Sequence, residues 1–137
     1  MSQWTHVVGI IHLNGAGGKE FGKIFSERFR KNIPEGSEGK LHCRVIRGDA
    51  TGRCGNDIFS YNWVVVIWGD LRDYGYKGDS DKIIQWIVDC TNFTELAAYV
   101  REGVIEINVE FAETVIMNFK KKSGEWGWII NKLEEDK

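Results

Sequence analysis

Residues 14–19, NGAGGK, are the stretch whose residue types most directly suggest chemistry. They follow an apolar run at residues 4–13 and lead into a helical pattern at residues 18–31, which is the order of parts in a phosphate-binding loop. Lys19 and the free N–H groups of a first helical turn could hold an anion. However, Glu20 stands where the motif GxxxxGK(S/T) needs a hydroxyl and where the fingerprint GxGxxG needs its third glycine. Since glycines also serve any tight strand-to-helix turn, the sequence favours a simple turn over a phosphate site.

A second glycine-rich segment, RGDATGRCGND at residues 47–57, carries two arginines. In the topology predicted below, it lies at the same end of the sheet as residues 14–19. The candidate ligand-binding residues at that end are Asn14, Gly15, Gly17, Gly18, Lys19, Arg47 and Arg53. Together they would form the site of a binding or enzymatic domain for a phosphorylated small molecule or a nucleotide, and this is the second of two functions that the sequence leaves open.

The remaining polar clusters do not form a catalytic or metal site. His6 and His12 fall on one face of the first predicted strand and His42 on the second, but no third ligand accompanies them. Asp70 and Asp73 could hold Mg²⁺, yet enzymes that do so on this kind of sheet also need an acid from the first strand. No serine or cysteine can be matched with a histidine and an acid as a nucleophile with its base. We therefore predict a non-catalytic protein with no metal and no cofactor.

Composition narrows the class of protein. The chain of 137 residues is short enough for a single domain, residues 1–137, and its 42% of hydrophobic residues indicates a folded globule. A formal charge of −2 gives no electrostatic attraction to nucleic acid or to an anionic membrane. The longest apolar run, residues 63–68, is too short to cross a bilayer. Three widely spaced cysteines and an N-terminus without a basic region predict free thiols in a cytoplasmic protein.

Hydrophobic periodicity gives the order of the elements. Strands are predicted at residues 4–13, 40–47, 61–68, 105–111, 114–120 and 125–131, and helices at residues 18–31, 81–90 and 94–101. This order, β-α-β-β-α-β followed by a β-hairpin, predicts an α+β domain with a ferredoxin-like antiparallel sheet of strand order 4-1-3-2 and helices on one face. The first and third strands would then be central, which agrees with the apolar residues on both of their faces. In the fourth strand, Ile105, Ile107 and Val109 are predicted to face the core and Glu106 the solvent.

The predicted sheet has a second face that the helices do not cover. Its central strands are apolar on that side too, so either the C-terminal hairpin or a second copy of the chain should cover it. We predict a homodimer in which Trp126 and Trp128 of the hairpin take part in the contact; the alternative is that these tryptophans fill the chain's own core. The predicted function is that of a small binding module acting through protein contacts. The small size and six tryptophans also give the impression of a phage or mobile-element protein, although no residue argues for it.

Overall fold

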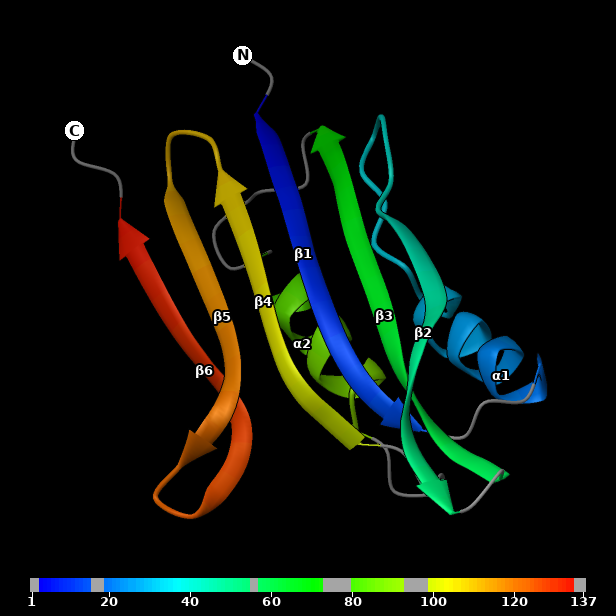
Figure 1. Ribbon diagram of the computed structural model, residues 1–137. Coiled ribbons are helices and arrows are strands. Elements are labelled where there is room, and N and C mark those ends of the chain that lie inside the picture. Colours follow the sequence, from blue (N-terminus) through cyan, green and yellow to red (C-terminus); the bar gives the residue numbers. More distant parts are fainter. Residues whose placement is uncertain (1–2, 16–18, 55–56, 73–79, 93–98, 135–137) are drawn as a thin grey trace.

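The computed structural model describes residues 3–15, 19–54, 57–72, 80–92 and 99–134 (Figure 1). They form the strands β1 (Trp4–Gly15), β2 (His42–Cys54), β3 (Asp57–Arg72), β4 (Tyr99–Val109), β5 (Glu113–Lys122) and β6 (Glu125–Glu134), and the helices α1 (Lys19–Arg30) and α2 (Ser80–Cys90). The predicted strands and the two longer predicted helices are confirmed. The third predicted helix is wrong at its C-terminal end, where residues 99–101 begin β4; the rest of it, residues 94–98, lies outside the described residues.

All six strands belong to one antiparallel sheet of order β2-β3-β1-β4-β5-β6. The predicted ferredoxin-like fold, a four-stranded sheet of order 4-1-3-2 with an appended hairpin, is therefore wrong. The β5–β6 hairpin continues the sheet beyond β4, so β4 is an interior strand and the domain is mostly β. The burial of β5 side chains explains why the hairpin joins the edge of the sheet. Val115 and Met117 are buried and pair with Ile107 and Ile105 of β4, so the hairpin extends the hydrophobic core in the plane of the sheet.

Both helices pack on one face of the sheet, behind the strands in Figure 1. Phe21, Phe25 and Phe29 are spaced four residues apart, so they form one stripe along α1, and all three are buried against the sheet. The buried apolar residues of α2 are Ile83, Ile84, Trp86, Ile87 and Cys90. No helix among the described residues is long and apolar enough to cross a membrane.

The alternation predicted for β4 is confirmed. Ile105 and Ile107 are fully buried and Val109 nearly so, whereas Glu106 is exposed on the other face. The same alternation runs through β1, in which every second residue faces the helices. The sheet therefore has one face packed against α1 and α2 and, among the described residues, one face without a helix.

The connection between α1 and β2 packs against the end of β3. The N–H of Ser37 donates to the carbonyl of Arg72 at 3.0 Å, and the N–H of Arg72 donates to the carbonyl of Glu38 at 2.9 Å. Gly39 has a φ of +77°, and a Cβ there would meet the carbonyl oxygen of Asp70. This position therefore requires glycine for both its backbone angle and its close approach to β3.

Candidate interaction face and pocket

The face of the sheet opposite the helices, called the open face below, carries a stripe of apolar side chains across its centre. The strand register places Val8 of β1 beside Trp68 of β3, and Ile10 between Val66 of β3 and Val104 of β4. Val8 is 59% exposed, and Trp68 and Val104 are each 44% exposed. The apolar side chains of the stripe are Val8, Ile10, Ile46, Val64, Val66, Trp68, Val104 and Ile116. Because the hairpin lies beside β4 within the sheet, it does not cover this stripe.

Charged side chains of opposite sign lie on β2 and β4, on the two sides of the part of the stripe that β1 and β3 carry. Arg44 of β2 lies beside Val66 and is exposed. Glu102 and Glu106 of β4 stand on either side of Val104 and are also exposed. Three strand spacings, about 14 Å, separate β2 from β4, so Arg44 cannot pair with these glutamates of its own chain. The centre of the open face thus has a basic side chain on β2 and acidic side chains on β4.

A histidine and two carboxylates meet at one end of the open face. Nδ1 of His6 lies 2.6 Å from Oδ1 of Asp70, and its Nε2 lies 3.8 Å from Oε2 of Glu110. The hydrogen bond with Asp70 raises the pKa of His6 above 6.5, and it outweighs the opposing effect of burial. Among the described residues, no group of three or more His, Cys, Asp or Glu side chains could hold a metal ion. We interpret the His6–Asp70 pair as a bridge between β1 and β3 and not as a catalytic dyad.

Two of the three cysteines can be placed, and both are free thiols, as the sequence predicted. Cys90 is buried in α2, and burial raises the pKa of its thiol to about 12. Burial also raises the pKa of Cys43, which is half-buried against the core. Because the thiolate is the reactive form, these cysteines are packing residues and not nucleophiles.

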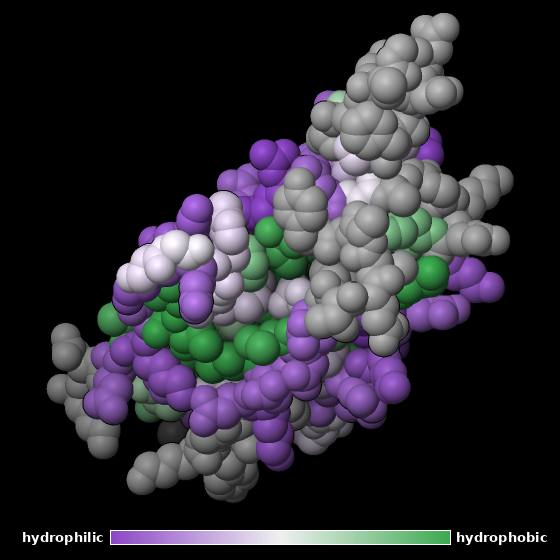
Figure 2. Space-filling model, turned by 90° about the horizontal axis from the view of Figure 1, so that it is seen from below, coloured by the Kyte–Doolittle hydropathy of each residue, from purple (hydrophilic) through white to green (hydrophobic). Residues whose placement is uncertain are grey.

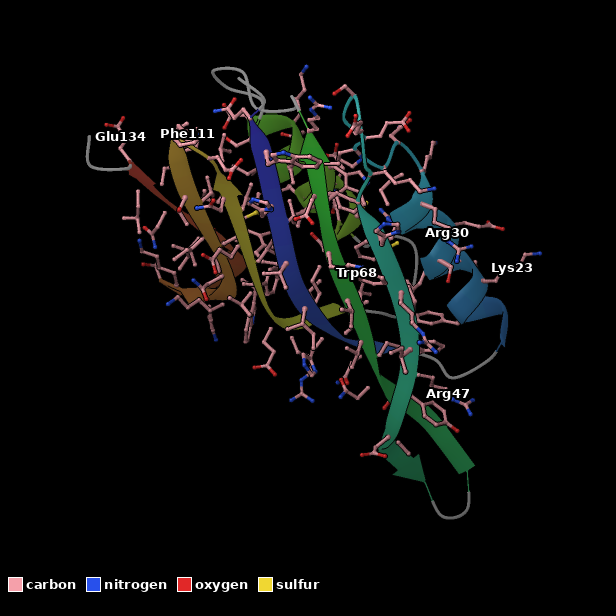
Figure 3. The ribbon with its side chains drawn as sticks, turned by 90° about the horizontal axis from the view of Figure 1, so that it is seen from above. Lys23, Arg30, Arg47, Trp68, Phe111 and Glu134 are labelled. Carbon is pink, nitrogen blue, oxygen red and sulfur yellow. The ribbon has the colours of Figure 1, made fainter. Side chains whose placement is uncertain are left out.

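The glycine-rich loop that was weighed as a phosphate site lies only partly within the described residues. Asn14 and Gly15 end β1, and Gly15 pairs with Tyr61, which also pairs with Ala50 of β2. Those strand ends are therefore together at one end of the sheet. The guanidinium of Arg47 lies 4.7 Å above the ring of Tyr61, at the β2 position labelled in Figure 3.

The other predicted ligand-binding residues are less completely placed. Lys19 is the first residue of α1, and Arg53 pairs with Ile58 between β2 and β3. The structure describes the backbone of these two residues but not their side chains. Gly17 and Gly18 lie outside the described residues altogether. The phosphate site therefore stays a prediction.

A pocket that the sequence did not predict lies where the sheet divides at its lower end in Figure 1. Pairing of β4 with β5 stops at Gly103 and Phe119, whereas β5 and β6 remain paired as far as Lys122 and Glu125. The hairpin therefore parts from β4. The space between the hairpin, the start of β4 and the end of α2 is a pocket of about 1110 Å³.

The two hairpin tryptophans predicted at a dimer contact both line this pocket. Nε1 of Trp128 donates to Oγ1 of Thr91 at 2.9 Å, and the indole meets the ring of Phe119 edge-on. A Cβ at Gly103 would lie 2.7 Å from the Trp128 ring, so the glycine lets the indole approach β4. Trp128 is thus fixed by contacts with its own chain, whereas Trp126 is 59% exposed.

Comparison with models of protein families, with curated proteins and with solved structures found no match to this chain. A phage or mobile-element origin has no support from these comparisons. Function is therefore inferred from the geometry of the open face and the pocket.

Proposed function

We propose that the protein is a small, non-catalytic interaction protein that binds through the open face, and that its first partner is a second copy of the same chain. The observation that supports this is the exposed apolar stripe. Full burial of one valine or larger apolar side chain stabilises a complex by about 1.5–3 kcal/mol. Val8 pairs with Trp68, and Val104 lies diagonally across from Val8 because it pairs with Ile10, so a single flat partner could cover all three. A contiguous apolar surface of this kind is typical of an interaction site.

The opposite charges on β2 and β4 support a second copy as the occupant. A twofold axis parallel to the strands places β2 of one copy over β4 of the other, because it reverses the strand order and keeps the strand direction. Arg44 of each copy then faces Glu106 of the other. Stacked sheets lie about 10 Å apart, a distance that arginine and glutamate side chains span together. The two equivalent sets of ion pairs give the self-complementarity that a closed dimer requires.

The test is light scattering coupled to size exclusion at micromolar concentration. The chain of 15.7 kDa should elute as a particle of twice that mass. Arg44→Glu or Glu106→Arg alone should shift the protein toward monomer, since each places like charges face to face. The double variant should restore the dimer, because it reverses the pair and keeps its attraction.

The matched control is Lys23→Glu, the same reversal of charge on α1, at a position that points away from the sheet (Figure 3). It should leave the mass unchanged. A wild-type protein that is monomeric would contradict self-association, and so would a dimer that survives both single reversals on the open face. Thermal melts of each variant separate loss of association from loss of folding.

A further inference from the structure

The pocket between β4 and the hairpin has an aromatic wall that is held in place and left uncovered. The indole of Trp126 lies parallel to the ring of Phe119, with an interplanar angle of 14° and centroids 6.2 Å apart. Phe119 is in turn braced by Trp128, which Thr91 of the α2 end anchors. A Cβ at Gly127 would have no atom within 4 Å, so the backbone beside Trp126 borders open space. The protein thus fixes a large aromatic surface without burying it, which is the preorganisation that a binding site uses.

The polar groups around this wall carry no net charge. Arg101 and Glu102 are neighbours at the start of β4, both are exposed, and both line the pocket. The amides of Asn62 and Asn92 line it as well, and His12 completes the rim. An amide offers donors and an acceptor, a guanidinium offers donors and a carboxylate offers acceptors. This set matches a ligand whose polar groups both donate and accept hydrogen bonds and which is itself neutral.

A sugar ring has these properties. One of its faces presents C–H groups, whose positive polarisation suits the negative face of an indole, and its rim presents hydroxyl groups that donate and accept. The pocket volume of about 1110 Å³ is slightly above the usual range for small-molecule sites, so it has room for more than one ring. Figure 2, which views the molecule from this end, shows green apolar residues beside purple hydrophilic ones.

We propose that this pocket binds a neutral oligosaccharide, with one sugar ring stacked on Trp126 and its hydroxyl groups held by Arg101, Glu102 and the two asparagines. This goes beyond the proposed self-association, which involves the centre of the open face. Single-stranded nucleic acid also stacks on aromatic side chains, but its phosphates need cations along the path. Among the described lining residues, Arg101 stands beside a glutamate, so the lining itself fits a neutral ligand. Lys121 pairs with Trp126 across the hairpin but is not among those lining residues, and binding of an oligonucleotide is therefore an outcome of the test.

The test is an array of neutral gluco-, manno-, xylo- and chito-oligosaccharides probed with the labelled full chain, followed by titration calorimetry with the best binder. Trp126→Ala should weaken that binding about tenfold or more, and Arg101→Ala should weaken it by a similar factor. The matched control is Phe111→Ala. Phe111 is 70% exposed at the β4–β5 turn, at the opposite end of the sheet (Figure 3), and its removal should change binding less than twofold.

Three results would overturn the proposal. They are an array on which no oligosaccharide is bound, binding that Trp126→Ala and Arg101→Ala leave intact, and binding of a thymidine oligonucleotide in the absence of any oligosaccharide binding. Circular dichroism melts show whether each variant is folded. Since Arg101 is exposed, its variant decides the matter if Trp126→Ala does not fold.

Discussion

Thr5→Val is expected to make the protein more stable, because the hydroxyl it removes is buried without a partner. Thr5 is fully buried in β1, and its Oγ1 has no hydrogen-bond partner among the residues that the structure describes. Its neighbours in the register are Leu71 of β3 and Val109 of β4, both buried. A buried hydroxyl without a partner costs about 1–3 kcal/mol, and valine has the same branched shape. We expect a gain of about 1–2 kcal/mol, which corresponds to a rise in Tm of about 4–8 °C for a chain of this size.

The measurement is urea unfolding followed by tryptophan fluorescence, at one fixed protein concentration so that any dimerisation contributes equally. The matched control is Thr114→Val. Oγ1 of Thr114 accepts a hydrogen bond of 2.8 Å from the side-chain amide of Asn108, so valine there should reduce stability by about 0.5–1.5 kcal/mol. If Thr5→Val lowers the urea midpoint as Thr114→Val does, the Thr5 hydroxyl is paired and the reasoning is refuted.

Two further outcomes follow from the described contacts. The raised pKa of His6 means that its pairing with Asp70 stabilises the protein fully below about pH 6.5 and that this contribution is lost as the pH rises through the folded-state pKa. His6→Gln should therefore lower the urea midpoint at pH 5.5 and leave it nearly unchanged at pH 8.5; an equal loss at both values would show that charge is not the cause. Gly39→Ala should cost about 3 kcal/mol in urea unfolding, because of its φ of +77° and its contact with β3, whereas Gly124→Ala, at a φ of +86° with no atom near the added Cβ, should cost about 1 kcal/mol. Equal costs at the two glycines would mean that the close approach to β3 contributes nothing.

The secondary structure was largely predictable because its signals are local. The spacing of Phe21, Phe25 and Phe29 can be recognised within a single helix, and the alternation in β4 within a single strand. Neither pattern depends on the rest of the fold. The position of the hairpin is a different problem, since its sequence shows that β5 and β6 pair with each other and not which edge they join. That choice depends on the open backbone edge of β4, on Val115 and Met117 reaching the same core, and on a short turn that keeps β5 beside β4. The predicted fold failed at this non-local step.

The candidate sites were likewise predictable where the signal is local and missed where it depends on contacts between distant strands. Apolar residues on both faces of β1 and β3 showed from sequence that the second face needs a cover, and the structure excludes the hairpin as that cover. The pocket was missed because it depends on where the β4–β5 pairing ends. Phe119, Trp126 and Trp128 on facing hairpin strands were its available signal. Arg101 could not add to that signal, since it fell in a segment predicted as helix.

The central position of β1 in the sheet has a consequence for the order in which the chain can fold. β1 pairs on one side with β3 and on the other with β4, which is complete only at Val109. At roughly 5–20 residues per second, its second neighbour follows about 5–20 s later. During that interval the β2–β3 hairpin can form by itself. The backbone groups of β1 that later pair with β4 have no partner strand, and β1 is rich in valine and isoleucine. Contacts of such long sequence separation slow folding, so the nascent chain is most exposed to mispairing before β4 arrives.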